Sequence, residues 1–127
     1  MSRDFIYHNE NPYRIEEQDC VCRAISKALD LDYEVTNKLL KMSAEVNGCD
    51  MLCHCCYKFL LEDIFKLPVR YANNNETVID VARMYPYNKL LIRIEGHLTT
   101  SDCGKIFDLW DCRNRLVDLY WIVPNKN

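Results

Sequence analysis

Glycine and proline are scarce in this chain, with three and four copies among 127 residues, whereas 49% of the residues are hydrophobic and 28% are charged. Collagen-like, low-complexity and disordered chains have a different composition, so we expect an ordinary globular protein. Splitting a chain of this length into two cores would leave each half with too little buried surface. We therefore predict a single domain.

Long hydrophobic runs and basic stripes are also missing. No stretch approaches the roughly 20 apolar residues that a membrane-spanning helix needs, and the first residues lack the apolar run of a signal peptide. The formal net charge is −3, and lysine and arginine form no stripe of the kind that binds a phosphate backbone. These absences predict a cytoplasmic protein that binds neither membranes nor nucleic acids.

Cysteine, by contrast, is abundant, with eight copies in the chain. Thiols stay reduced in the cytosol, so a disulfide framework is not expected. Buried thiols, a metal site and a catalytic nucleophile are the three interpretations that remain.

The order of the predicted elements indicates an α+β fold with helices at the N-terminus and an antiparallel sheet at the C-terminus. Residues 1–18 are predicted to be an irregular arm, and residues 19–127 one domain. Hydrophobic periodicity, caps and turn residues predict four helices, at 20–29, from Asp32 to before Gly48, at 51–65, and from Asn75 or Thr77 to before Pro86. The strands are predicted at 69–72, 89–95, 97–101, 105–110 and 116–123.

Three residues from distant parts of the chain fit the roles of cysteine catalysis. Cys20 is predicted to begin a helix, where unpaired N–H groups and the helix dipole favour a thiolate. His97 follows Gly96 at the start of a strand, and Asp108 lies one strand further, where its carboxylate could orient the imidazole. A nucleophile, a base and an orienting group are what this chemistry requires.

Two segments resemble a known family. Residues 19–25, DCVCRAI, resemble the Asp-Cys-x-x-Arg-Ala-Ile opening of small papain-like cysteine peptidases encoded by phages and prophages. Residues 96–98 and 104–111, followed by the aromatic end of the last strand, resemble the family's Gly-His segment and its aromatic-Asp-x-Trp-Asp segment. Residues 46–88 share only their helical character with the family.

The resemblance implies a papain-like fold and a cysteine hydrolase of the peptidase or amidase type, acting without a cofactor on a peptide or protein substrate. It implies Cys20 as nucleophile, His97 as general base and Asp108 as the orienting acid. Papain-type enzymes carry an oxyanion-hole glutamine several residues before the nucleophile, but Arg14 stands there. Gln18 or the backbone N–H of Cys20 alone would then supply this donor. The implied location is the cytoplasm of a phage-infected bacterial host, or the virion.

The same resemblance leaves a second function open. Phage proteins also use such folds without catalysis. The chain would then be a structural or accessory protein of a phage particle, or a protein that binds a host protein, with contacts to the particle or to further copies of itself. Tyr7 and Tyr13 in the arm would be candidate anchors for such a partner.

Asp111 competes with Asp108 for the third position of the triad. The two residues point to opposite faces of a regular strand, and we favour Asp108. Asp111 is better interpreted as the residue that caps the turn at 113–115. Cys22, two residues from the candidate nucleophile, is an extra thiol that the family pattern does not contain.

A cluster of cysteines at 49–56 is the main competing signal. Cys49, Cys53 and Cys56 share one face of a helix, but a zinc ion needs a fourth ligand, for which Cys103, Cys112 or a histidine are candidates. We favour core packing for Cys53 and Cys56 and an exposed position for His54, and we expect no metal.

Overall fold

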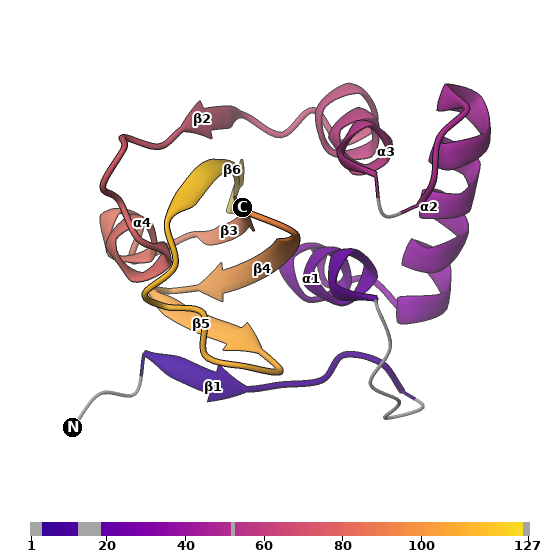
Figure 1. The fold of residues 1–127 in the computed structure, drawn as a ribbon. Helices are drawn as coiled ribbons and strands as arrows, with labels where there is room; N and C mark the ends of the chain where they lie inside the picture. Colours follow the sequence, from indigo (N-terminus) through magenta and orange to yellow (C-terminus); the bar gives the residue numbers. More distant parts are fainter. Residues whose placement is uncertain (1–3, 13–18, 52, 126–127) are drawn as a thin grey trace.

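The computed structural model describes residues 4–12, 19–51 and 53–125. Over these residues the protein is a mixed α+β structure with four α-helices, one π-helical turn and one sheet of six strands (Figure 1). Three of the helices lie on one side of the sheet and the fourth on the other (Figure 1). No helix in these ranges combines the length and apolar character needed to cross a bilayer.

The first two helices have the predicted positions. α1 is Cys20–Leu29 and α2 is Tyr33–Asn47. The carboxylate of Asp32 caps α2 by accepting the N–H of Glu34, and Gly48 ends the helix in a left-handed conformation at φ 63°. Asp19 precedes α1 as predicted, but its side chain forms no capping hydrogen bond, because it is bound by other side chains.

The third predicted helix is shorter and less regular than expected. α3 is His54–Lys58, and the chain continues as a π-helical turn, η1, at Phe59–Ile64. The prediction of one α-helix over 51–65 was therefore wrong at its start and in its second half. α4 is Val78–Met84. The residue before it, Thr77, is its N-cap and forms a reciprocal capping box with Asp80.

The sheet contains the five predicted strands, of which four are shorter than predicted and β4 is one residue longer. They are β2 (Val69–Tyr71), β3 (Lys89–Ile94), β4 (His97–Asp102), β5 (Lys105–Asp108) and β6 (Val117–Val123). Strand order in the sheet is β1-β5-β4-β3-β6-β2. β5 ends at Asp108 and not at residue 110, because the Asp108 carboxylate accepts the N–H of Leu109 where the chain turns away.

The arm contributes a strand that was not predicted. β1 (Phe5–Tyr7) pairs with β5 in parallel and forms one edge of the sheet (Figure 1). The prediction of an irregular arm was therefore wrong for these residues, and the sheet is mixed where a purely antiparallel one was expected. The remaining pairs of neighbouring strands are antiparallel.

Both faces of the sheet are covered, which explains the continuous hydrophobic sequence of β3. Leu91 faces α1, α2 and α3, whereas Leu90 and Ile92 face α4. Alternate side chains of a strand point to opposite faces, so both sets are buried when helices cover both faces. The larger core lies on the α1 side and includes Trp121, which is fully buried. This core holds α1 firmly against the sheet.

Candidate active site

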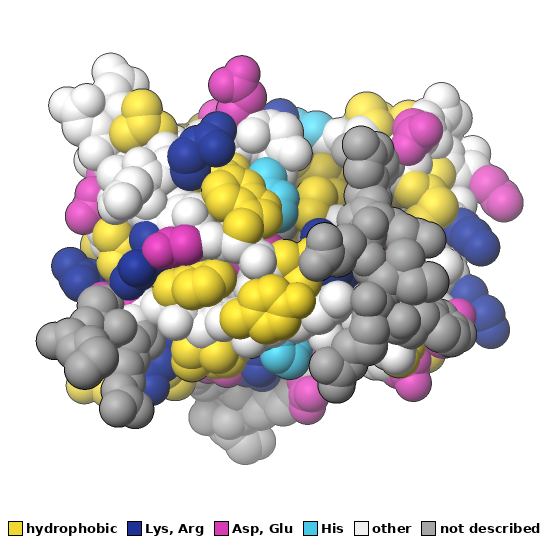
Figure 2. Space-filling model, turned by 60° about the horizontal axis from the view of Figure 1, so that its bottom comes forward, with side chains coloured by type: hydrophobic (Ala, Val, Ile, Leu, Met, Phe, Trp, Pro, Cys, Tyr) yellow, Lys and Arg dark blue, Asp and Glu magenta, His cyan; other side chains and the backbone are white. Residues whose placement is uncertain are grey.

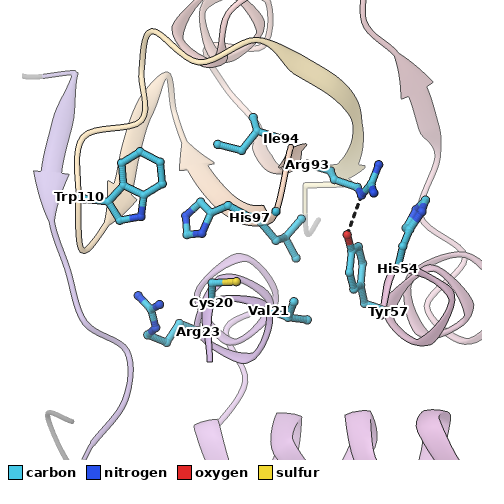
Figure 3. A pocket seen from close by; sticks show the side chains of 11 residues that line it. Cys20, Val21, Arg23, His54, Tyr57, Arg93, Ile94, His97 and Trp110 are labelled. Carbon is cyan, nitrogen blue, oxygen red and sulfur yellow. Dashed lines mark hydrogen bonds between the residues drawn. The ribbon is translucent and has the colours of Figure 1, made fainter. Parts of the chain in front are cut away.

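Cys20 is the first residue of α1, and its half-buried thiol lines a cavity of about 440 Å³ (Figure 3). The N–H groups of a first helical turn lack partners within the helix and favour a negative charge. The backbone N–H of Leu98 on β4 also donates to the sulfur. This position therefore stabilises a thiolate from both the helix and the sheet.

His97 begins β4, directly after Gly96, which is left-handed at φ 69° in the turn from β3. Its Nε2 lies 2.6 Å from Oδ2 of Asp108. Nδ1 is therefore the nitrogen that remains for the thiol, and Figure 3 shows the ring directly above Cys20. The ring of Trp110 lies at 4.9 Å from the imidazole, in a tilted contact that covers one side of it.

Asp108 is the last residue of β5 and is buried, with 5% of its surface exposed. One carboxylate oxygen accepts from His97, and the other accepts the N–H of Leu109 at 2.7 Å. A buried carboxylate that is fixed on both oxygens can hold an imidazole in a single orientation. The structure thus brings Cys20, His97 and Asp108 together from α1, β4 and β5.

The electrostatics of these groups favour a thiolate at Cys20 and an imidazolium at His97. Burial acts to raise the pKa of the Cys20 thiol, but the hydrogen bond and charge of His97, the N–H of Leu98 and the charge of Arg23 lower it below its usual value. Burial acts in the opposite sense on His97, where the hydrogen bonds and charges of Asp108 and Cys20 raise the pKa to about 9. The thiol is therefore acidic and the imidazole basic, as a nucleophile and its proton carrier require.

The Asp108 carboxylate stays ionised within this network. Burial acts to raise its pKa, but the hydrogen bond and the positive charge of His97 outweigh burial and lower the pKa below its usual value. Below this carboxylate lies Cys112, a buried thiol 3.8 Å from Oδ2 of Asp108. Burial and the charge of Asp108 raise the pKa of Cys112 to about 12, so it remains a neutral donor.

A buried ion pair supports the triad, and sequence reasoning missed it. Arg23 donates from Nε to Asp19 at 2.6 Å, and its Nη1 lies 3.7 Å from Oδ1 of Asp108. The guanidinium therefore links the start of α1 to the end of β5. The spacing of four residues between Asp19 and Arg23 on one helix was a signal for this pair, although nothing local indicated that it would be buried.

The arm reaches the same network through Asn11, which is 2% exposed. Its amide donates to Oδ2 of Asp19 at 3.0 Å, and the hydroxyl of Tyr33 donates to the same oxygen at 2.7 Å. Asp19 thus accepts hydrogen bonds from the arm, α1 and α2. This explains why its side chain is not free to cap α1, and it makes part of the arm a support for the site.

The far wall of the cavity, away from Trp110, is formed by Tyr57, Arg93 and His54 (Figure 3). Arg93 donates from Nε to the Tyr57 hydroxyl at 2.9 Å and forms an ion pair with Asp118. His54 was expected to face water, and this was wrong. Its ring packs against Tyr57 and Trp121, with centroid distances of 5.3 and 6.3 Å, and its Nε2 is shielded and has no hydrogen-bond partner among the described residues.

The other predicted site residues have varied outcomes. Gln18 and Tyr13 lie outside the described residues. Asp111 is exposed and caps the turn as predicted, since it accepts the N–H of Arg113 at 3.1 Å and binds its guanidinium. Cys22 is buried, its thiol donates to the Tyr33 carbonyl, and burial raises its pKa to about 11, so this extra thiol is not a second nucleophile.

Two groups among the described residues have the geometry to bind a metal ion. One consists of His97, Asp108 and Cys112, which the interactions above already occupy. The other consists of Cys49, Cys53 and Cys55, and not of the predicted set with Cys56. Cys56 is buried as predicted, whereas Cys53 is exposed, so core packing was the wrong interpretation for Cys53.

Histidine and hydrophobic side chains are exposed together on the face of the molecule that carries β1 (Figure 2). Trp110, which lies beside His97, is one of the exposed hydrophobic residues, with 40% of its surface accessible. Its ring also lies beneath the guanidinium of Arg115, at 5.7 Å. The entrance to the cavity is therefore bordered by an aromatic surface on the His97 side.

Comparison with family models, with curated proteins and with solved structures finds no match for this chain.

Proposed function

We propose that the protein is a cysteine hydrolase of the peptidase or amidase type, with Cys20 as nucleophile, His97 as general acid and base, and Asp108 as the orienting group. The observation that supports this most directly is the meeting of the three side chains, although 88 positions separate Cys20 from Asp108 in the sequence. Cys20 and His97 line one cavity, and Asp108 binds the imidazole of His97. Packing alone does not require a thiol, an imidazole and a carboxylate in this order.

The reaction would proceed through an acyl-enzyme. The Cys20 thiolate attacks the carbonyl carbon, and the C–N bond breaks as Nδ1–H of His97 protonates the leaving amine. Water then attacks the thioester while His97 accepts its proton, which releases the carboxylic acid and restores the Cys20 thiolate and the His97 imidazolium. The backbone N–H of Cys20 would stabilise the oxyanion, with Gln18 as the proposed second donor.

The cavity itself favours polar or acidic substrates. Among the described residues, its titratable lining consists of Cys20, Tyr57, two histidines and two arginines, and none of them is a carboxylate. Arg23 is buried between Asp19 and Asp108, with 10% of its side chain exposed. Arg93, on the wall opposite Trp110, is the more accessible cation, with 26% of its side chain exposed, and it pairs with Asp118. We propose that Arg93 and Tyr57 receive the carbonyl or carboxylate of a residue next to the cleaved bond.

The papain-like fold, and the phage setting that the sequence resemblance implies, belong to the same proposal. A helix that carries the cysteine and a sheet that carries the histidine and the acid support it. The host would be a phage-infected bacterium, with the protein in its cytoplasm or in the virion, and with a peptide or protein as partner.

One observation favours the alternative, a protein of this fold that serves a phage particle or binds a host protein without catalysis. Tyr7 on the edge strand β1 is 61% exposed, and Tyr71 on the opposite edge strand is 72% exposed. Exposed aromatic side chains are common anchors of protein interfaces. Under this alternative, Tyr7→Ala would weaken docking, whereas Cys20→Ala would have no effect.

Alkylation of Cys20 by iodoacetamide tests the thiolate–imidazolium pair. Because the Cys20 pKa is lowered and the His97 pKa is raised to about 9, Cys20 should form a thiolate at lower pH than an ordinary cysteine does, with the imidazolium beside it up to about pH 9. We expect rapid labelling of Cys20 at pH 6.5, measured by peptide mass spectrometry. Cys103 is the internal control, because its hydrogen bond to Asp102 raises its pKa and it should label slowly.

Asp108→Asn removes the charge that raises the His97 pKa, so the imidazolium should deprotonate at lower pH and the Cys20 pKa should rise. The labelling rate at pH 6.5 should then fall about tenfold for each unit of pKa change. Two results would contradict the proposed thiolate–imidazolium pair. One is equal labelling rates for Cys20 and Cys103 in the wild type, and the other is a Cys20 labelling rate that Asp108→Asn leaves unchanged.

A further inference from the structure

Three cysteines converge at the corner between α2 and α3, away from the triad. Cys49 follows the left-handed Gly48 that ends α2, Cys53 directly precedes α3, and Cys55 lies in its first turn. Their sulfur atoms all lie within 4.8 Å of one another, and those of Cys53 and Cys55 are 3.0 Å apart. Neither an imidazole nor a carboxylate of a described residue belongs to this group.

Packing does not explain this convergence. Cys49 is half-buried and packs against the larger core, but Cys53 and Cys55 are exposed, so their sulfur atoms gain little from the hydrophobic core. The neighbouring Cys56 shows the contrast: it is fully buried, and its thiol donates to the carbonyl of Leu40 at 3.3 Å. A buried thiol that packs and donates has a structural explanation, whereas three thiols gathered at the surface have none of this kind.

Metal coordination does explain it. Zinc binds thiolates at about 2.3 Å in a tetrahedron, which places neighbouring sulfur atoms about 3.8 Å apart. The distances between the three sulfur atoms in the structure differ from this spacing by about 1 Å or less. A donor set of thiolates alone selects soft, thiophilic ions and disfavours magnesium and calcium, which prefer oxygen ligands.

We propose that Cys49, Cys53 and Cys55 form a three-thiolate binding site for a zinc ion, with the fourth position open to water. Binding converts each thiol to a thiolate, so up to three protons are released to solvent as three Zn–S bonds form. No electron transfer is involved. This reverses the expectation from the sequence that the cysteines at 49–56 hold no metal.

The three-cysteine site lies next to the helix that forms one wall of the cavity, so zinc binding should affect that wall. The three ligands lie at both ends of the short connection between α2 and α3, where the backbone N–H groups of Cys49 and Cys53 donate to the nearby carbonyls of Ala44 and Asp50. α3 then leads directly to Tyr57, which forms the far wall of the cavity with Arg93. Zinc would therefore stabilise the protein and hold this wall in place.

The test is a titration of the reduced, chelator-stripped full chain with zinc against a chromophoric chelator, followed by cadmium, whose thiolate complexes absorb in the ultraviolet. We expect one tight equivalent of each metal, a thiolate-to-cadmium absorption band and a higher melting temperature with zinc. Cys53→Ser and Cys55→Ser should each weaken binding by more than tenfold. Cys103→Ser, which removes an exposed thiol outside the cluster, should bind as the wild type does.

Cys20→Ala separates this site from the triad, because it should abolish hydrolysis and leave zinc binding unchanged. The absence of a tight equivalent in the wild type would overturn the proposal. So would unchanged affinity in both serine variants, or loss of binding in Cys20→Ala, which would place the metal at the triad. If one serine variant fails to fold, the other and Cys49→Ser provide the same measurement.

Discussion

Cys20→Ala is expected to abolish amide hydrolysis while the protein remains folded. The substitution removes the atom that would form the acyl-enzyme, and loss of the nucleophile from a triad costs at least about 10⁴-fold in rate. Its effect on stability should be small, because the thiol is half-buried at a cavity and only borders the larger core. The measurement is the cleavage of a mixture of synthetic peptides, including acidic ones, followed by mass spectrometry.

Two controls make this result specific. Cys103→Ala removes an exposed thiol in the turn between β4 and β5 and should cleave at the wild-type rate. The melting temperatures of both variants should match that of the wild type. Cleavage that survives in Cys20→Ala would exclude the proposed nucleophile. A wild-type protein that cleaves none of the peptides and labels Cys20 slowly would favour the non-catalytic alternative.

The elements that were predicted well are those with strong local signals. α1 and α2 carry periodic hydrophobic residues, and the second ends at a glycine that adopts the left-handed conformation. The strands β3 to β6 combine β-branched and aromatic residues with clear turns, such as Cys103-Gly104, where both residues have positive φ. Local sequence determines such elements, so their approximate positions follow without tertiary information.

The elements that were missed depend on distant partners. β1 has only three residues and is a strand because β5, about a hundred positions later, offers a free edge. The π-helical turn η1 has no signature in the hydrophobic pattern, and the side chain of Asp19 leaves its capping position because Arg23, Asn11 and Tyr33 bind it. Tertiary contacts decided each of these outcomes.

The candidate site shows the same division. Cys20, His97 and Asp108 could be selected from the sequence because their residue types match three chemical roles and the resemblance gave their positions. Arg93 and Tyr57 could not, since one comes from a strand and the other from a helix, and an arginine on a strand is usually solvated. The bulge between β3 and β6 at Arg93 and Ile94 helps to place Asp118 beside Arg93. Such a placement depends on strand register and not on local composition.

Arg23→Met is expected to destabilise the protein by about 3–5 kcal/mol, because it leaves the buried Asp19 carboxylate without its cation and removes one of the two cations beside Asp108. Arg23 is 8% exposed, and its partners Asp19 and Asp108 are 9% and 5% exposed. Methionine fills much of the same space, so the loss reports mainly on charge and hydrogen bonding. Unfolding by urea, followed by circular dichroism, gives the free energy of unfolding of each variant.

Lys58→Met is the matched control, because Lys58 and Glu62 form an ion pair with the same spacing of four residues, at 2.9 Å. Its side chain is 49% exposed, so water screens the pair and the expected loss is about 0.5 kcal/mol or less. The loss of unfolding free energy in Arg23→Lys should lie between those of Arg23→Met and Lys58→Met. Lysine keeps the charge but lacks the guanidinium fork that reaches Asp19 and Asp108 together. Equal losses in Arg23→Met and Lys58→Met would show that the buried network does not hold α1 to β5. The position of Cys20 relative to His97 would then depend on hydrophobic packing alone.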